Sequence, residues 1–273
     1  IIFSMSKKYY KLTKILIPIE TASGERRVSA TPGAVKKLKS LGCEVFVESS
    51  AGELSGFSDF LYKKSGGKIF NTSEDKIWEV ADIVFCVQPP SEINLNKLKK
   101  GAILLGLLNP YSNDKLLKII INNKISALSL ELLPRISRAQ SSDVLSSQAN
   151  IAGYKAVLLA ASELDRYFPM LMTAAGTVQP AKVVVLGGGV AGLQAVATAK
   201  RLGAIVFVSD IRPAVKEQVE SLGARFIELP EINEKPGEAG GYAKAVTPEF
   251  LSKQKATLTK YLAEADVAVC TAQ

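Results

Sequence analysis

The sequence contains no histidine among its 273 residues. Histidine is the commonest general acid/base and the commonest metal ligand near neutral pH, so its absence removes the simplest routes to both chemistries. Cysteine is scarce and odd in number, since only Cys43, Cys86 and Cys270 occur, each in an apolar, strand-like context without metal-ligand spacing. We therefore expect buried free thiols, with neither a disulfide framework nor a metal site.

Long apolar runs are also missing, because no stretch reaches the length needed to span a bilayer. The formal net charge of +8 is spread over many lysines, and the only local cluster, Lys7 to Lys14, has no nucleic-acid motif around it. We interpret that cluster as a solvated basic tail rather than a nucleic-acid site. The chain begins on Ile1 without a native start or a complete signal peptide and stops on an apolar strand, which suggests a fragment.

The apolar content of 47% is enough for a substantial core, and the length allows two domains. Over residues 1–145, short apolar strands alternate with helical segments, one of which is capped by Thr31 and Pro32. The expected strands are 14–20, 44–48, 68–70, 82–87, 102–108 and 125–132, and the expected helices are 32–41, 59–64, 73–80 and 112–122. This rhythm predicts an α/β domain with a doubly wound parallel sheet. Its strands lack a glycine fingerprint, so we do not expect it to hold a dinucleotide by itself.

Residues 146–273 contain the most informative stretch of the chain. A β-branched strand at 183–186 is followed by Gly187, Gly189 and Gly192 in G-x-G-x-x-G spacing, then by a helix at 190–202. Gly187 allows the tight turn, Gly189 lets the backbone approach a pyrophosphate, and Gly192 lets the helix pack on the strand. A glycine turn alone is weak evidence, but a second strand ending in Asp210 completes a dinucleotide-binding pattern. The sequence therefore predicts a second doubly wound, Rossmann-like domain.

Asp210 bears on the choice of nucleotide. A carboxylate at the end of the second strand accepts hydrogen bonds from the adenosine ribose and repels a 2′-phosphate, which favours NAD. Arg212 is the counter-argument, because an arginine there can hold that phosphate. We predict NAD as the cofactor.

Three further segments carry alternatives. The polar stretch 134–143 is either a solvated linker or part of a nicotinamide site in an interdomain cleft. One long helix is expected over 144–168, with Tyr154 and the methionines Met170 and Met172 in the core. Residues 231–246 are glycine-rich and contain Tyr242, which favours a mobile lid over a plain surface loop. A helix is expected at 213–223, and strands are expected at 224–229 and 265–273.

Several of these stretches together resemble one family. They are residues 134–140, 143–154, 187–203 and 240–244, with 24–32 also fitting. They are similar to the NAD(H)-binding component, domain I, of proton-translocating nicotinamide nucleotide transhydrogenase, a family related in fold to the alanine dehydrogenases. The resemblance covers nearly the whole chain. It implies two Rossmann-like domains joined by a long helix, with the family's C-terminal part missing here.

The resemblance also implies site residues and partners. Gln140, Arg135 and Asp143 match the catalytic positions at the reacting nicotinamide, with Gln140 closest to the ring. The matched NAD contacts are Arg135, Ile136, Ser137, Arg138, Gln140, Ser141, Ser142, Asp143, Ser146, Gly187, Gly189, Val190, Gly192, Asp210, Ile211, Arg212, Gly241, Tyr242, Gln254 and Gln273. The family's domain I is a homodimer that works with an NADP(H)-binding domain and a proton-channel membrane domain. It lies on the soluble face of a mitochondrial-type inner membrane or a bacterial-type cytoplasmic membrane.

An amino-acid dehydrogenase is the rival hypothesis, and a non-catalytic NAD-sensing module is the third. Oxidising an amino acid moves a proton as well as a hydride, so it needs an acid/base group beside the substrate. Alanine dehydrogenases resemble this chain but carry a histidine at the position of Asn109 and a lysine at that of Gln88. Hydride exchange between two nicotinamides needs only positioning and exclusion of water, which a site without histidine can supply.

Overall fold

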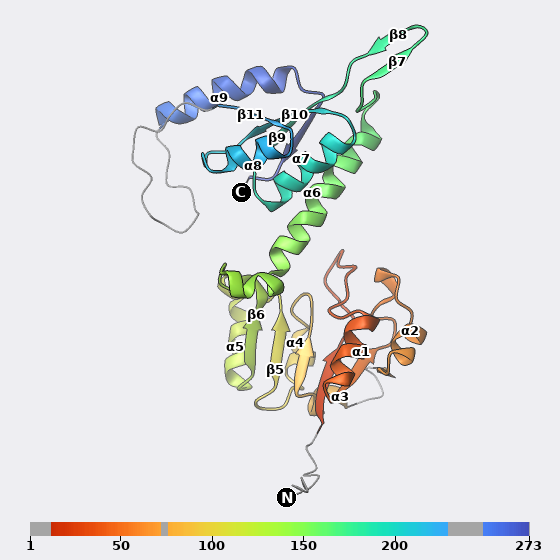
Figure 1. The fold of residues 1–273 in the computed structure, drawn as a ribbon. Helices are drawn as coiled ribbons and strands as arrows, with labels where there is room; N and C mark the ends of the chain where they lie inside the picture. Colours follow the sequence, from red (N-terminus) through yellow and green to blue (C-terminus); the bar gives the residue numbers. More distant parts are fainter. Residues whose placement is uncertain (1–11, 72–75, 229–247, 273) are drawn as a thin grey trace, which may run out of the picture. The chain divides into compact units, whose positions relative to one another are not determined.

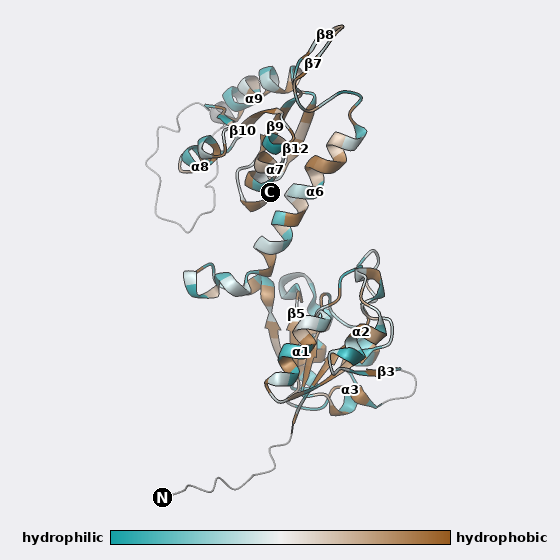
Figure 2. Ribbon diagram, turned by 45° about the vertical axis from the view of Figure 1, so that its right-hand side comes forward, coloured by the Kyte–Doolittle hydropathy of each residue, from teal (hydrophilic) through white to brown (hydrophobic). Residues whose placement is uncertain are grey.

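The computed structural model describes residues 12–71, 76–228 and 248–272 of the chain (Figure 1). The chain divides into two compact units, unit 1 (Ile1–Asp143) and unit 2 (Val144–Gln273). Each unit is an open parallel sheet with helices, so the predicted α/β class with two Rossmann-like folds is confirmed. Figure 2 shows the hydrophobic colouring concentrated on the strands, as expected of sheets buried on both faces.

In its described residues, unit 1 has a six-stranded sheet in the order β3-β2-β1-β4-β5-β6, all parallel. The strands are β1 Thr13–Ile17, β2 Cys43–Glu48, β3 Lys68–Phe70, β4 Ile83–Phe85, β5 Ile103–Gly106 and β6 Ser126–Ser129. Along β1, Leu16 joins the core cluster on one face, while Ile15 and Ile17 join the cluster on the other. This alternation is the period of two that a strand imposes, and it explains why the strand is apolar throughout.

The helices described beside this sheet are α1 Pro32–Ser40, α2 Asp59–Lys64, α3 Ile77–Val80, α4 Glu92–Leu95 and α5 Asp114–Asn122. Thr31 caps α1 as predicted, because its hydroxyl accepts a hydrogen bond from the amide of Ala34 at 3.3 Å. Helix α3 begins at Ile77 rather than at Ser73, which lies outside the described residues. The short α4, capped by Ser91, was not predicted. The 3-10 turns described are η1 Glu53–Ser55, η2 Pro110–Ser112, η3 Leu130–Leu132 and η4 Ser137–Ser142.

Unit 2, as far as it is described, has a four-stranded parallel sheet in the order β11-β10-β9-β12 and a separate antiparallel hairpin, β7-β8. Its elements are α6 Val144–Glu163, β7 Leu171–Thr173, β8 Gly176–Val178, β9 Lys182–Leu186, α7 Val190–Arg201, β10 Ile205–Ser209, α8 Val215–Ser221, β11 Arg225–Phe226, α9 Pro248–Ala263 and β12 Val267–Cys270. Val206 and Val208 of β10 pack in the core with α7, whereas Phe207 between them contacts Tyr261 of α9 at a ring distance of 5.2 Å. Helices therefore cover both faces of this sheet.

The predicted helix over 144–168 is wrong beyond Glu163. The chain leaves the helix because Arg166 donates hydrogen bonds to Asp266 at 2.7 Å and to the carbonyl of Gln179 at 3.0 Å. The carbonyl of Phe168 then accepts the amide of Ala181 at 3.0 Å, and Pro169 cannot continue a helix. These contacts are formed with residues far along the chain, which a local pattern does not contain.

The predicted core positions of Tyr154, Met170 and Met172 are also wrong, since all three side chains are exposed. Met170 precedes and Met172 lies on the two-stranded hairpin, which joins neither parallel sheet in the described structure. Of the three cysteines only Cys86 is buried, whereas Cys43 is half-buried and Cys270 is exposed. The predicted strand at 224–229 shrinks to the two residues of β11, and the described residues add α9, which the sequence did not suggest.

Candidate functional site

The connection from β9 to α7 forms a tight glycine turn. Gly187 has φ of +100°, a left-handed value that a residue with a side chain rarely adopts. Its amide donates to the carbonyl of Ser209 at the end of β10 at 2.8 Å, and its carbonyl accepts the hydroxyl of Thr271 at 2.9 Å. The turn is therefore fixed by the ends of both neighbouring strands.

The other two glycines of the motif differ in what surrounds them. A Cβ on Gly192 would lie 1.8 Å from the carbonyl oxygen of Gly187, so only glycine allows the helix to start this close to the strand. A Cβ on Gly189 would meet no atom of the described residues within 4 Å. Gly189 therefore leaves open space at the start of α7, as an approaching pyrophosphate requires.

Helix α7 offers an anion site at its N-terminus. Its first hydrogen bond at this end runs from the amide of Leu193 to the carbonyl of Gly189 at 2.8 Å, so the amides before Leu193 have no partner within the helix. Helix α6 holds α7 from one side, because a Cβ on Gly153 would lie 2.0 Å from the carbonyl oxygen of Ala191. Asn150 of α6 also donates to Gln194 of α7 at 3.1 Å.

Asp210 ties the end of β10 to the glycine turn. Its Oδ2 accepts the amide of Gly188 at 2.7 Å, while the Arg212 guanidinium forks onto both oxygens at 2.9 Å. Burial on its own raises the pKa of Asp210, but the hydrogen bonds from Arg212 and Gly188 outweigh it and hold the pKa below its ordinary value. The carboxylate is thus ionised and placed beside the turn. A ribose hydroxyl reaches it only where the half-exposed Arg212 side chain moves aside.

The polar stretch of unit 1 follows β6 and forms the 3-10 turn η4. The amide of Asp143 donates to the carbonyl of Gln140 at 3.2 Å, which leaves the Gln140 side chain exposed to solvent. Asp143 is half-buried. The other predicted contacts of this stretch are exposed, namely Arg135, Ile136, Ser137, Arg138, Ser141 and Ser142. The side chains thus stand beyond the carboxyl end of a parallel strand, where ligands of such sheets bind.

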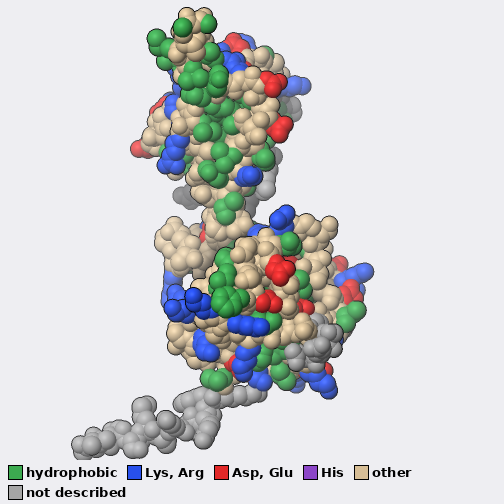
Figure 3. Space-filling model, turned by 90° about the vertical axis from the view of Figure 1, so that its right-hand side faces the viewer, with side chains coloured by type: hydrophobic (Ala, Val, Ile, Leu, Met, Phe, Trp, Pro, Cys, Tyr) green, Lys and Arg blue, Asp and Glu red, His purple; other side chains and the backbone are tan. Residues whose placement is uncertain are grey.

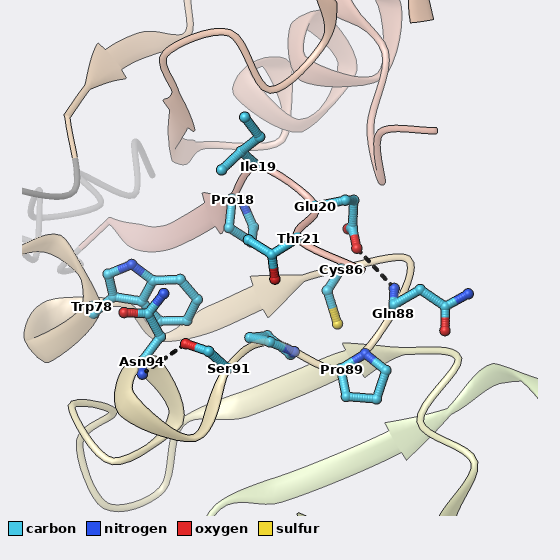
Figure 4. Close-up of a pocket in the computed structure, with 11 residues that line it drawn as sticks. Pro18, Ile19, Glu20, Thr21, Trp78, Cys86, Gln88, Pro89, Ser91 and Asn94 are labelled. Carbon is cyan, nitrogen blue, oxygen red and sulfur yellow. Dashed lines mark hydrogen bonds between the residues drawn. The ribbon is translucent and has the colours of Figure 1, made fainter. Parts of the chain in front are cut away.

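A second group of polar side chains lies where β1 and β4 end, and sequence reasoning missed it. Glu20 accepts the amides of Val87 at 2.6 Å and Gln88 at 3.0 Å, while the Gln88 side-chain amide donates to Glu25 at 3.2 Å. Burial raises the pKa of Glu20, whereas hydrogen bonds from the Arg27 side chain lower the pKa of Glu25 to about 2. Figure 4 shows Glu20 and Gln88 beside a cavity of about 10 Å³, which has room for one water molecule.

The described residues contain no cluster of potential metal ligands. None of the helices described is both long and apolar enough to cross a membrane.

Comparison with known proteins decides the family. The models of the alanine dehydrogenase/PNT N-terminal and C-terminal domains match residues 16–152 and 156–273. An NAD(P) transhydrogenase subunit alpha chain of Rhodospirillum rubrum is 48% identical over 95% of this chain and 69% of its own length. The chain belongs to the NAD(P) transhydrogenase alpha-subunit family.

Other relatives agree with this assignment. NAD(P) transhydrogenase subunit alpha of Haemophilus influenzae is 43% identical over 94% of this chain, which spans 49% of that protein's length. The crystal structure of transhydrogenase from Sinorhizobium meliloti matches with a TM-score of 0.82 and 43% identity over 94% of this chain and 69% of that one. An L-alanine dehydrogenase structure is more distant, with a TM-score of 0.67 and 28% identity over 78% of this chain and 60% of that one.

Within this family member, each unit gathers its own share of the predicted contacts. In unit 2 the glycine turn collects Gly187, Gly189, Val190, Gly192, Asp210, Ile211 and Arg212. Ser146 lies in the first turn of α6 and Gln254 in α9, both half-buried. Gly241, Tyr242 and Gln273 lie outside the described residues, as does the predicted lid. The assignment of all these residues to NAD stays a prediction.

Proposed function

We propose that the chain is the NAD(H)-binding component of a proton-translocating transhydrogenase. In this proposal a hydride passes directly between NADH on this chain and NADP⁺ on a partner domain, and a membrane domain couples the transfer to proton movement. Residues 1–145 and 146–273 act as separate domains, the second of which binds NAD. The observation that carries the proposal is the glycine turn, with open space at Gly189 and the Asp210 carboxylate beside it.

The chemistry of the described residues fits this role. Hydride exchange between two nicotinamides has no proton to transfer at the reacting carbons, and the chain has no histidine to transfer one. What the reaction requires is that both rings are held close together with water excluded. The amides at the start of α7 and Asp210 would hold the adenosine diphosphate half, and Arg135, Gln140 and Asp143 would orient the nicotinamide half.

The test is hydride exchange in a reconstituted complex. The chain, extended by its native flanking sequence, is mixed with the NADP(H)-binding domain of a transhydrogenase, and transfer from NADH to NADP⁺ is followed by stopped flow. Transfer that needs both components is the expected result. Binding of NADH without transfer would favour the NAD-sensing module instead.

Replacing Asp210 tests the choice of nucleotide. We expect the chain to bind NADH more tightly than NADPH, and Asp210→Ala to weaken NADH binding by about 1–3 kcal/mol, because ribose hydroxyls lose their acceptor. Fluorescence titration measures both affinities. Asp266→Ala is the matched control, because Asp266 also pairs with an arginine and accepts a backbone amide, but at the start of β12. Equal affinities for NADH and NADPH in the unaltered chain would contradict the prediction.

An alanine dehydrogenase is the second candidate, favoured only by the more distant relatives. The position of its lysine is Gln88, whose amide is engaged by Glu25, and the position of its histidine is Asn109. Neither residue can carry a proton at neutral pH. We therefore expect no alanine-dependent reduction of NAD⁺ by the full-length protein, and that restoring histidine and lysine at these two positions does not by itself create activity. Steady reduction of NAD⁺ on adding alanine would reverse the choice.

We also propose that the chain forms a homodimer. Figure 3 shows hydrophobic side chains gathered at the end of the molecule that carries the hairpin β7-β8. Tyr167, Met170 and Met172 are all more than half exposed there, and apolar patches of this kind favour a partner. We expect light scattering to give the mass of two chains, and replacement of Met170 and Met172 by serine to shift it toward one. Tyr111→Ser, an exposed position in unit 1, is the control that should leave the mass unchanged.

A further inference from the structure

The sheet of unit 1 has a topological switch point that the proposed function leaves without a role. Strand β1 lies between β2 and β4, so the connections that follow β1 and β4 lead to opposite sides. In open parallel sheets, ligands bind in the crevice that forms at this point beyond the carboxyl ends of the strands. Here the segment after β1 supplies Glu20, Glu25 and Arg27, and the segment after β4 supplies Gln88.

The carboxylate of Glu25 occupies this point and is surrounded by donors. The Arg27 guanidinium forks onto it, with Nε 2.8 Å from Oε1 and one terminal nitrogen 2.7 Å from Oε2. The backbone amides of Arg26 and Arg27 donate to Oε1 at 3.1 and 3.0 Å. Gln88, 63 positions further along the chain, donates its side-chain amide to Oε2 at 3.2 Å. The Glu25 side chain is only 8% exposed.

This arrangement is one that proteins use to bind a carboxylate ligand. A planar guanidinium that meets both oxygens gives charge and geometry together, and an amide from a second strand fixes the orientation. An ordinary surface ion pair would be exposed and held by two flexible side chains. We propose that the switch point of unit 1 is a carboxylate-binding site, and that Glu25 is its built-in occupant, which excludes small carboxylate anions from solution.

Two features define the class of ligand. Glu20 stands beside the site with its carboxylate on the amides of Val87 and Gln88, so a second negative charge on the ligand would be repelled. The adjoining cavity, lined among others by Pro18, Trp78 and Cys86, holds no more than one water molecule. The ligand is therefore a monocarboxylate of two or three carbons. This inference stands whether or not the chain exchanges hydride with a partner.

Removing the occupant tests the proposal. Glu25→Ala leaves a space that propionate fits, and the full chain is then titrated with propionate by calorimetry and by thermal unfolding. We expect propionate to bind this variant at least about tenfold more tightly than the unaltered chain, because a forked charged contact becomes available. Propionamide, which has the same shape without charge, should not bind. Adding Arg27→Gln to the variant should abolish the binding.

A matched variant separates a site from a merely structural ion pair. Glu44 pairs with Lys68 in the same unit, and its side chain is also mostly buried. Glu44→Ala should not gain propionate binding. If Glu25→Ala does not fold, Glu25→Gln keeps the shape and removes the charge, and propionate should raise its unfolding temperature but not that of the unaltered chain. Propionate that acts no better than propionamide on whichever variant folds would show that Glu25 only anchors its loop.

Discussion

Gly192→Ala should abolish dinucleotide binding and destabilise unit 2. The new methyl group would lie 1.8 Å from the carbonyl oxygen of Gly187 and 3.0 Å from the hydroxyl of Thr271, so the backbone has to move. Overpacking of this kind costs about 3 kcal/mol in the free energy of unfolding. The same shift would turn the first amides of α7 away from the pyrophosphate. Loss of two charge-assisted hydrogen bonds weakens NADH binding by on the order of a hundredfold.

Gly189→Ala is the control that separates folding from binding. Its φ of −77° suits any residue, and a methyl group there would touch nothing in the described part of the chain. We expect the free energy of unfolding to change by less than about 1 kcal/mol, while NADH binding falls as far as in Gly192→Ala, because the methyl group takes the space of the pyrophosphate. Urea unfolding and fluorescence titration measure the two effects. Normal NADH affinity in Gly189→Ala would place the nucleotide elsewhere.

These two glycines show what a sequence can predict. The turn, its strands and the Thr31 cap depend on residues within about a dozen positions of one another, so their spacing contains the geometry. The spacing predicted the steric role of Gly192 and the place of Asp210 beside the turn. It did not predict that Arg212 already forks onto Asp210, because that contact depends on a rotamer rather than on a pattern.

The failures have a different physical origin. Helix α6 ends early because Arg166 bonds to Asp266, 100 positions away, and the Glu25 site depends on Gln88, 63 positions away. Pairings at this distance are set by the topology of the sheet, which local periodicity does not contain. Met172 was placed in the core because it is apolar, yet it lies on a hairpin outside both parallel sheets. Hydrophobicity indicates that a residue will be buried only when some other element is there to cover it.

Gln140 carries the prediction with the largest expected effect on rate. It lies in the 3-10 turn η4, where its backbone carbonyl accepts the amide of Asp143 while its side chain is exposed. A glutamine amide both donates and accepts, which suits holding the nicotinamide half of NADH. It carries no charge, so it can lie beside a ring whose charge changes during the reaction without favouring either redox state.

Gln140→Asn shortens the side chain by one methylene and leaves the amide in place. Since NADH affinity is expected to rest on the glycine turn and Asp210 of unit 2, the variant should bind NADH almost normally. Hydride transfer to NADP⁺ on the partner domain should slow by on the order of a hundredfold, because a shift of about 1 Å at the reacting atoms has that effect. Stopped-flow transfer beside a binding titration measures both, and Gln218→Asn, an exposed position on α8, is the matched control. If affinity and rate fall in equal proportion, Gln140 serves binding rather than the alignment of the two rings.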